Sequence, residues 1–166
     1  MTRKILFLLA AVLVFGSCDK PSRVAQYKAE KHQRDSVALV QQTQSLTYYQ
    51  SQLAELMPVA DSLMAFFSYE KNPRFQDHGY YIVKPSAVGR SYSDLRVMVR
   101  DDGKESILLY RDGKRITGDG LRGKDQAMIE CAQHLQIVIS DIRECEKRIA
   151  HTSKEVQKYE KRLQKQ

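Results

Sequence analysis

The sequence predicts an α+β fold: a long antiparallel helical hairpin, forming a coiled-coil stalk, with a small antiparallel β-meander inserted as a head. Two observations carry this prediction. The last forty residues repeat apolar side chains every seven positions, which is typical of a coiled-coil helix. The middle of the chain consists of short strand-like runs divided by Asp-Gly turns. A weaker heptad pattern precedes the strands, so the order is helix, sheet, helix.

Residues 1–17 are predicted to be a signal peptide. Two basic residues precede an unbroken apolar run over 5–15, and the small residues Gly16 and Ser17 follow it. The run is shorter than the roughly 20 residues that cross a bilayer, which favours an export signal over a membrane-spanning helix.

The segment Phe15-Gly16-Ser17-Cys18 resembles the lipobox of bacterial lipoproteins, with the serine before the cysteine that is seen in the Bacteroidota. Phe15 departs from the pattern, because leucine is usual at that position. The resemblance implies that Cys18 is acylated, as with palmitate, becomes the first residue of the mature chain and anchors it to a membrane. The alternative is an ordinary secreted protein. Surface-exported lipoproteins of the Bacteroidota tend to carry an acidic cluster after the cysteine, so the resemblance implies that the acid-poor start "CDKPSR" belongs to a periplasm-facing anchor in the cell envelope.

The chain is basic, and its charge is unevenly distributed. The formal net charge is +7, and cleavage before Cys18 lowers it to +5 by removing two basic residues. Basic residues gather near both ends of the mature chain, whereas residues 36–67 contain only Glu55 and Asp61 as charges. Export removes nucleic acid as a partner, so lipid head groups or acidic wall polymers fit this charge better.

Residues 18–57 are predicted to be the N-terminal anchor and stalk helix. The two periodic rows begin in this segment and continue past it: Leu39, Leu46, Leu53, Ala60 and Phe67, and Gln42, Tyr49, Leu56 and Leu63. Pro58 lacks a backbone donor and is expected to kink or restart the helix. Helices are therefore expected at about 24–57 and 59–68.

Residues 58–123 are predicted to form the short second helix and the β-meander head. Four antiparallel strands are expected within 79–117, in the runs "GYYIVKP", "YSDLRVMVR", "ESILLYR" and "KRIT". The turns "DDGK" and "RDGK" supply the positive φ that tight hairpins need. So small a sheet needs a helix against it, and Phe66, Phe67 and Tyr69 are expected to support it.

Residues 124–166 are predicted to be the C-terminal coiled-coil helix. The heptad positions are Met128, Leu135, Ile142, Ile149, Val156 and Leu163, with Cys131, Val138, Cys145, Thr152 and Tyr159 between them. Residues 36–57 and 124–146 are expected to pair, which returns both basic ends to the neighbourhood of Cys18 and holds the head roughly 50 Å from the lipid. The alternative is a homodimer in which each long helix pairs with its copy.

The two remaining cysteines bear on that alternative. Cys131 and Cys145 lie fourteen residues apart on one stripe, about 21 Å along a helix, and cannot bridge each other. In an oxidising envelope such cysteines are either buried thiols, which we favour, or form intermolecular disulfides between copies.

No catalytic, cofactor or metal site is predicted, and we do not expect an enzyme. The segment "GDGLRG", residues 118–123, matches the dinucleotide-binding pattern G-x-G-x-x-G, with Asp141 and Glu144 about twenty positions on. That fold needs a second parallel strand after the helix, and here the helix runs to the end of the sequence. The glycines are therefore expected to allow entry into the last helix. The four histidines show no ligand spacing.

The function expected is that of a membrane-anchored, non-catalytic cell-envelope lipoprotein whose head binds another envelope protein. Tyrosine and arginine are frequent anchors of protein interfaces. The candidate partner surface is Tyr80, Tyr81, Tyr92, Arg96, Arg100 and Tyr110. The bland alternative is that these tyrosines complete the core of the head. A second functional hypothesis is a periplasmic holdase chaperone with basic helical arms.

Overall fold

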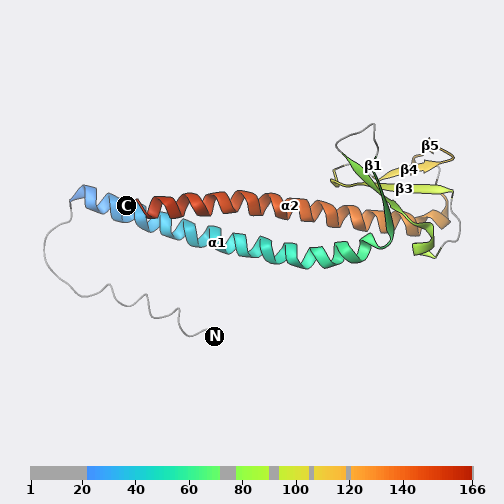
Figure 1. Cartoon of the computed structure of the whole chain (residues 1–166). Coiled ribbons are helices and arrows are strands. Elements are labelled where there is room, and N and C mark those ends of the chain that lie inside the picture. The colour runs from blue at the N-terminus through green and yellow to red at the C-terminus, as the bar shows by residue number, and fades with distance from the viewer. Residues whose placement is uncertain (1–21, 72–77, 90–93, 105–106, 119–120, 166) are drawn as a thin grey trace.

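A computed structural model describes residues 22–71, 78–89, 94–104, 107–118 and 121–165 of the chain. Two long helices and a five-stranded antiparallel sheet confirm the α+β class and the helical hairpin with its inserted meander (Figure 1). The signal segment, Cys18 and Tyr92 lie outside the described residues.

Helix α1, Arg23–Met64, is one continuous element of 42 residues. Ser22 caps it, because its hydroxyl accepts a hydrogen bond from the Ala25 N–H at 3.3 Å. Both predicted rows lie on its partly buried side, from Leu39 to Leu63. Pro58 lies inside the helix rather than between two helices. The expected second helix over 59–68 is wrong, because α1 ends at Met64 and the chain then enters a strand.

The sheet is a simple meander with strand order β1-β2-β3-β4-β5. The strands are β1 (Phe67–Lys71), β2 (Gly79–Val83), β3 (Leu95–Arg100), β4 (Leu108–Arg111) and β5 (Lys114–Arg115). Strands β2 to β5 fall in the four predicted runs. Strand β1 was not predicted. It forms because Phe67 pairs with Val83 and is buried under the sheet, a tertiary contact that outweighs the helical pattern before it.

Both predicted Asp-Gly turns have the expected positive φ. Asp112 and Gly113 have φ values of 50° and 74° between β4 and β5, as a tight hairpin requires. Gly103 has a φ of 66° after β3, and a Cβ added there would lie 3.1 Å from Ile139 of the last helix. Glycine is therefore needed at 103 for both its backbone conformation and the close approach of the helix.

Helix α2, Gln126–Leu163, follows the predicted heptad closely. All eleven predicted positions are buried or partly buried, which confirms the seam. The first half of α2 covers one face of the sheet. The resulting core brings together Phe67, Val83, Leu95, Val97, Val99, Met128, Ile129, Ala132, Leu135 and Ile139. We call the five strands with residues 126–139 the head.

The remainder of α2 pairs with α1, and we call this pair the stalk. Near its end, Arg162 forms an ion pair with the buried carboxylate of Asp35 at 3.8 Å. The expected pairing of 36–57 with 124–146 is therefore shifted: the first half of α2 packs on the sheet, and the basic second half lies along α1. The sheet needs an apolar cover, and residues 128–139 supply it. The start of α1 extends beyond the end of α2 (Figure 1).

Candidate functional site

The face of the sheet that points away from α2 carries the candidate binding site. Side chains alternate along β3, so that Leu95, Val97 and Val99 are buried against α2 while Arg96 and Met98 point outward. Pairing places Tyr110 opposite Arg96 and Leu108 opposite Met98 on the same outer face. Strands that are nearest neighbours thus present a mixed aromatic, apolar and charged surface.

This surface is hollowed into a groove of about 430 Å³, which we call the sheet groove. It is lined by Tyr80, Asp94, Arg96, Met98, Leu108, Tyr110, Asp112 and Gly113. The apolar lining comes from two tyrosines, Met98 and Leu108, and the charged groups come from Arg96 and two aspartates. Apolar walls with a few polar groups of fixed position are the usual composition of a binding pocket.

The charged groups of the groove are held by neighbours. Arg96 forms an ion pair with Glu70 of β1, and about half of each side chain is exposed. Asp94 forms ion pairs with Arg111 at 3.2 Å and with Arg122 at 3.0 Å. These pairs fix the positions of the groups while leaving Arg96 accessible to a partner.

Three of the six predicted partner residues meet in the sheet groove: Tyr80, Arg96 and Tyr110. Tyr81 does not belong to it, because the next residue along a strand points to the opposite face. Its ring lies 5.2 Å from the ring of Tyr69, and burial raises the pKa of its hydroxyl. Tyr92 lies outside the described residues.

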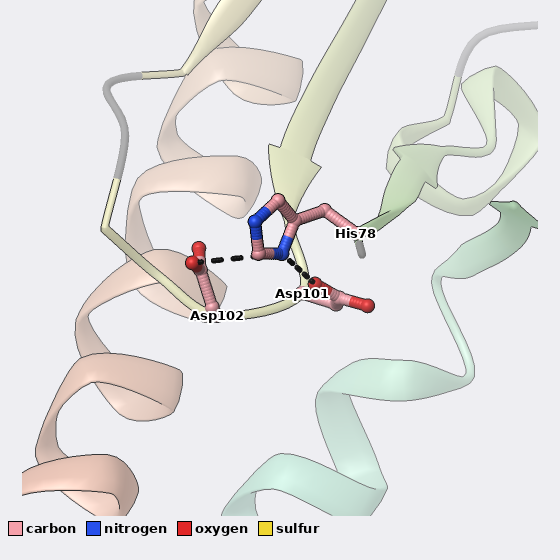
Figure 2. A group of neighbouring side chains, drawn as sticks. All are labelled: His78, Asp101 and Asp102. Carbon is pink, nitrogen blue, oxygen red and sulfur yellow. Dashed lines mark ion pairs between the residues drawn. The ribbon is translucent and has the colours of Figure 1, made fainter. Parts of the chain in front are cut away.

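The sixth residue, Arg100, belongs to a different cluster at the end of β3. Its guanidinium donates to Asp102 at 2.8 Å and to Nε2 of His78 at 2.8 Å. Figure 2 shows His78 beside Asp101 and Asp102, with the histidine just before β2 and the aspartates just after β3. Nδ1 of His78 lies 3.9 Å from Asp101 and 3.8 Å from Asp102.

Within the described residues, this is the one group of three ligand-type side chains close enough to share a metal ion. The hydrogen bond from Arg100 to His78 argues against metal binding by this group. A guanidinium only donates, so Nε2 of His78 must accept and its ring proton must sit on Nδ1, the atom that faces the aspartates. A protonated Nδ1 has no lone pair for a metal, and the Arg100 charge disfavours a cation further.

The carboxylates of Asp101 and Asp102 also accept hydrogen bonds from neighbouring groups of the fold. Asp101 accepts from the Gly79 N–H at 2.8 Å and from the Tyr69 hydroxyl at 3.0 Å. The hydrogen bond to Asp101 raises the pKa of that hydroxyl. Burial works against ionisation of Asp102, yet the Lys104 N–H and the Arg100 guanidinium together hold its pKa below the ordinary value. The cluster therefore ties β1, β2 and the turn after β3 together.

Sequence reasoning missed this cluster because His78 lies more than twenty residues before Arg100 and the two aspartates. Antiparallel pairing of β2 with β3 brings these residues together, because His78 lies just before β2 and the aspartates of "DDGK" follow the end of β3. The register itself could not be read from the sequence, since only the buried alternation of both strands fixes it.

The glycine-rich segment leads directly into α2, as expected. Its last residue, Gly123, begins a short 3₁₀ turn that ends at the fully buried Asp125. The Asp125 carboxylate accepts from the Arg122 N–H at 2.8 Å and from the guanidinium of Arg111. Residues 119–120 lie outside the described chain. The segment is used to join the sheet to the helix.

Both cysteines of α2, Cys131 in the head and Cys145 in the stalk, are free thiols and partly buried in this single chain. Cys131 packs against the core of the head, and burial raises the pKa of its thiol. Burial and then the charges of Asp141 and Glu144 raise the pKa of Cys145. Protonated thiols react slowly in disulfide exchange, so neither environment activates its cysteine.

No helix in the described part of the chain has a stretch long and apolar enough to cross a membrane. Comparisons of the chain with protein-family models, with curated proteins and with solved structures found no match.

Proposed function

We propose that this chain is a membrane-anchored, non-catalytic lipoprotein of the cell envelope that presents its head to a protein partner. The sheet groove carries the proposal, because it gathers Tyr80, Arg96 and Tyr110 around an apolar floor. Tyrosine and arginine provide large contact area together with hydrogen bonds, and they dominate the energetics of many interfaces.

The position of the groove supports this function. It lies on the head, at the end of α1 opposite to the segment that bears Cys18. A helix of 42 residues is about 63 Å long, so within one chain the groove is far from the proposed lipid anchor. An anchor at one end and a binding surface at the other suit a protein that recruits a partner to a membrane on its periplasmic side.

A photoreactive phenylalanine analogue at position 110 tests the groove in intact cells that produce the full chain. The proposal predicts a discrete crosslinked product with a second protein, lost when Arg96→Glu is combined with it. The same analogue at Lys158, an exposed stalk position, is the matched control and is expected to give no such product. If position 110 gives no crosslinked product, or only products that position 158 also gives, the proposal is contradicted.

The anchor is tested separately with a labelled fatty acid. Label is expected in the full chain and not in the Cys18→Ser variant, which should also leave the membrane fraction. If the label persists in the variant, Cys18 is not the lipid attachment site. This result is independent of the groove, so the two halves of the proposal fail or survive separately.

A further inference from the structure

The outward face of α1 differs from every other helix face of the stalk in having no charge. Residues 36–54 are nineteen consecutive residues without Asp, Glu, Lys, Arg or His. By contrast, the second half of α2 carries charged residues in nearly every turn, several of them in ion pairs such as Arg148 with Glu144 at 2.6 Å. A helix face in water normally needs such charges, so the uncharged face is the anomaly.

The uncharged face contains a second heptad stripe, opposite to the seam with α2. We call this the outer stripe: Val37, Val40, Gln44, Thr47, Ser51, Ala54 and Pro58, spaced alternately by three and four residues. All seven positions are exposed, and Val37 and Val40 remain 51% and 56% exposed. An apolar hollow opens along it, lined by Leu39, Val40, Thr43, Gln44 and Thr47. Apolar residues at three-four spacing are the pattern by which a helix packs on another helix, and Val37, Val40, Ala54 and Pro58 are the apolar members of this stripe.

We propose that a second copy of this chain packs on the outer stripe, with the two α1 helices antiparallel. The match in size supports this arrangement: about the midpoint of residues 37–54, Val37 faces Ala54 of the second copy and Val40 faces Ser51, while Pro58 lies outside the matched pairs. Each large side chain thereby meets a small one. Gln44 faces Thr47 at the centre, where two uncharged polar groups can hydrogen-bond.

Charge complementarity selects the antiparallel orientation. Arg34 and Glu55, both exposed, occupy the same heptad position beside the stripe, on either side of its uncharged stretch. An antiparallel pair brings Arg34 of each copy against Glu55 of the other, twice by symmetry. A parallel pair would instead align the basic start of α1 with itself. The favourable match ends beyond Arg34, because Glu30 would approach Asp61 of the second copy and the two carboxylates would repel each other.

The inference goes beyond the proposed function and does not depend on lipidation. If both copies are anchored, the two anchors leave from opposite ends of the paired helices, and the dimer lies along the membrane surface. The sheet grooves stay free, because the outer stripe and the grooves belong to different faces of the molecule. The dimer would then present two grooves at once.

Cysteine crosslinking of the full chain in intact cells tests the interface, in a parent with Cys131→Ala and Cys145→Ala. Positions 40 and 51 are about 16 Å apart in one helix, so they cannot bridge within a chain. The antiparallel dimer predicts no crosslinked dimer from Val40→Cys alone or from Ser51→Cys alone, and a strong one when both are present. Crosslinking by each single variant would mean a parallel pair, and no crosslinking by any variant would mean a free face. Either result would overturn the proposal.

Two controls make the result specific. The pair Lys147→Cys with Lys158→Cys is also exposed and eleven residues apart, but it lies on the charged face of α2 and is expected to give no dimer. The parent, which still contains Cys18, must give no crosslinked dimer, so that any dimer is due to the introduced cysteines. Arg34→Glu and Glu55→Arg should each lower the yield of the 40/51 crosslink about threefold to tenfold, and the double reversal should restore it. Loss without restoration would contradict the assigned orientation.

Discussion

The head and the stalk are built on the same helix, yet they bury side chains to different depths. On the first half of α2, Met128, Ala132 and Leu135 are at most 1% exposed beneath the sheet. Further along, the seam residues Ile142, Ile149 and Val156 are only partly buried, because a single helix covers them. Three elements can enclose a core and two helices cannot. The head should therefore hold most of the stability of the chain, and the stalk should depend on it.

The buried charge of the head is expected to be its most sensitive point. Asp125 is fully buried and binds Arg111, whose side chain is 10% exposed. Asp125→Ala removes the fully buried partner of that guanidinium and leaves it only the partly exposed Asp94, so we expect a loss of about 3 kcal/mol in unfolding free energy. Chemical denaturation followed by circular dichroism measures the loss. Asp141→Ala, at an exposed position of α2, should cost under about 0.5 kcal/mol.

A matched pair of leucines compares the two regions directly. Leu135→Ala opens a cavity in the head and should cost about 2–5 kcal/mol. Leu46→Ala, at a partly buried position of the stalk, should cost about 1 kcal/mol, because less apolar surface is lost and the site is open to water. Thermal or denaturant unfolding of the two variants measures the two losses of unfolding free energy, which are then compared. Equal losses would mean that the stalk encloses a core as tightly as the head.

Acid should weaken the head through Asp102. Because its pKa is lowered in the folded chain, its contribution is present in full above the unfolded value of about 4 and is lost as the pH falls through the folded value. Denaturant midpoints between pH 5 and pH 2 are expected to fall less steeply in Asp102→Asn than in the unmodified chain. Parallel curves for the two proteins would mean that Asp102 does not cause the loss of stability in acid.

The smallest effect is expected on the charged face of the stalk. Arg148 holds the pKa of Glu144 below its ordinary value through a hydrogen bond, but both side chains are about half exposed. Water and salt screen such pairs, so Glu144→Gln should leave stability almost unchanged. A melting curve at low and at high salt measures it. A larger loss that high salt does not reduce would show that this face is packed rather than solvated.

The sequence predicted elements best where a single pattern governs them. The α2 heptad was predicted in full, because both the sheet and α1 pack on the same stripe. The strands from Gly79 onward followed from alternation and Asp-Gly turns. Strand β1 and the continuation of α1 through Pro58 were missed, since pairing with Val83 and packing on α2 outweigh local preferences there.

The candidate site was predicted only in part, for a geometric reason. Tyr80, Arg96 and Tyr110 were chosen for their chemistry, and alternation placed Arg96 on the outer face. Choosing Tyr80 over Tyr81 required the register between β2 and β3, which pairs Tyr80 with Arg100. The cluster around His78 depends on the same register. A shift of one residue would exchange the two faces, and composition alone does not exclude it.

The hairpin within one chain is the central claim, and a distance between its free ends tests it most directly. Spin labels at Lys31 and Lys161, with the native cysteines replaced by serine and labelled chains diluted in unlabelled ones, would be measured by pulsed electron resonance. Paired helices lie about 8–10 Å apart, so the labels should stand within about 25 Å. A distribution centred beyond roughly 50 Å would contradict the hairpin, and with it the placement of the head at the end of α1 away from the proposed anchor.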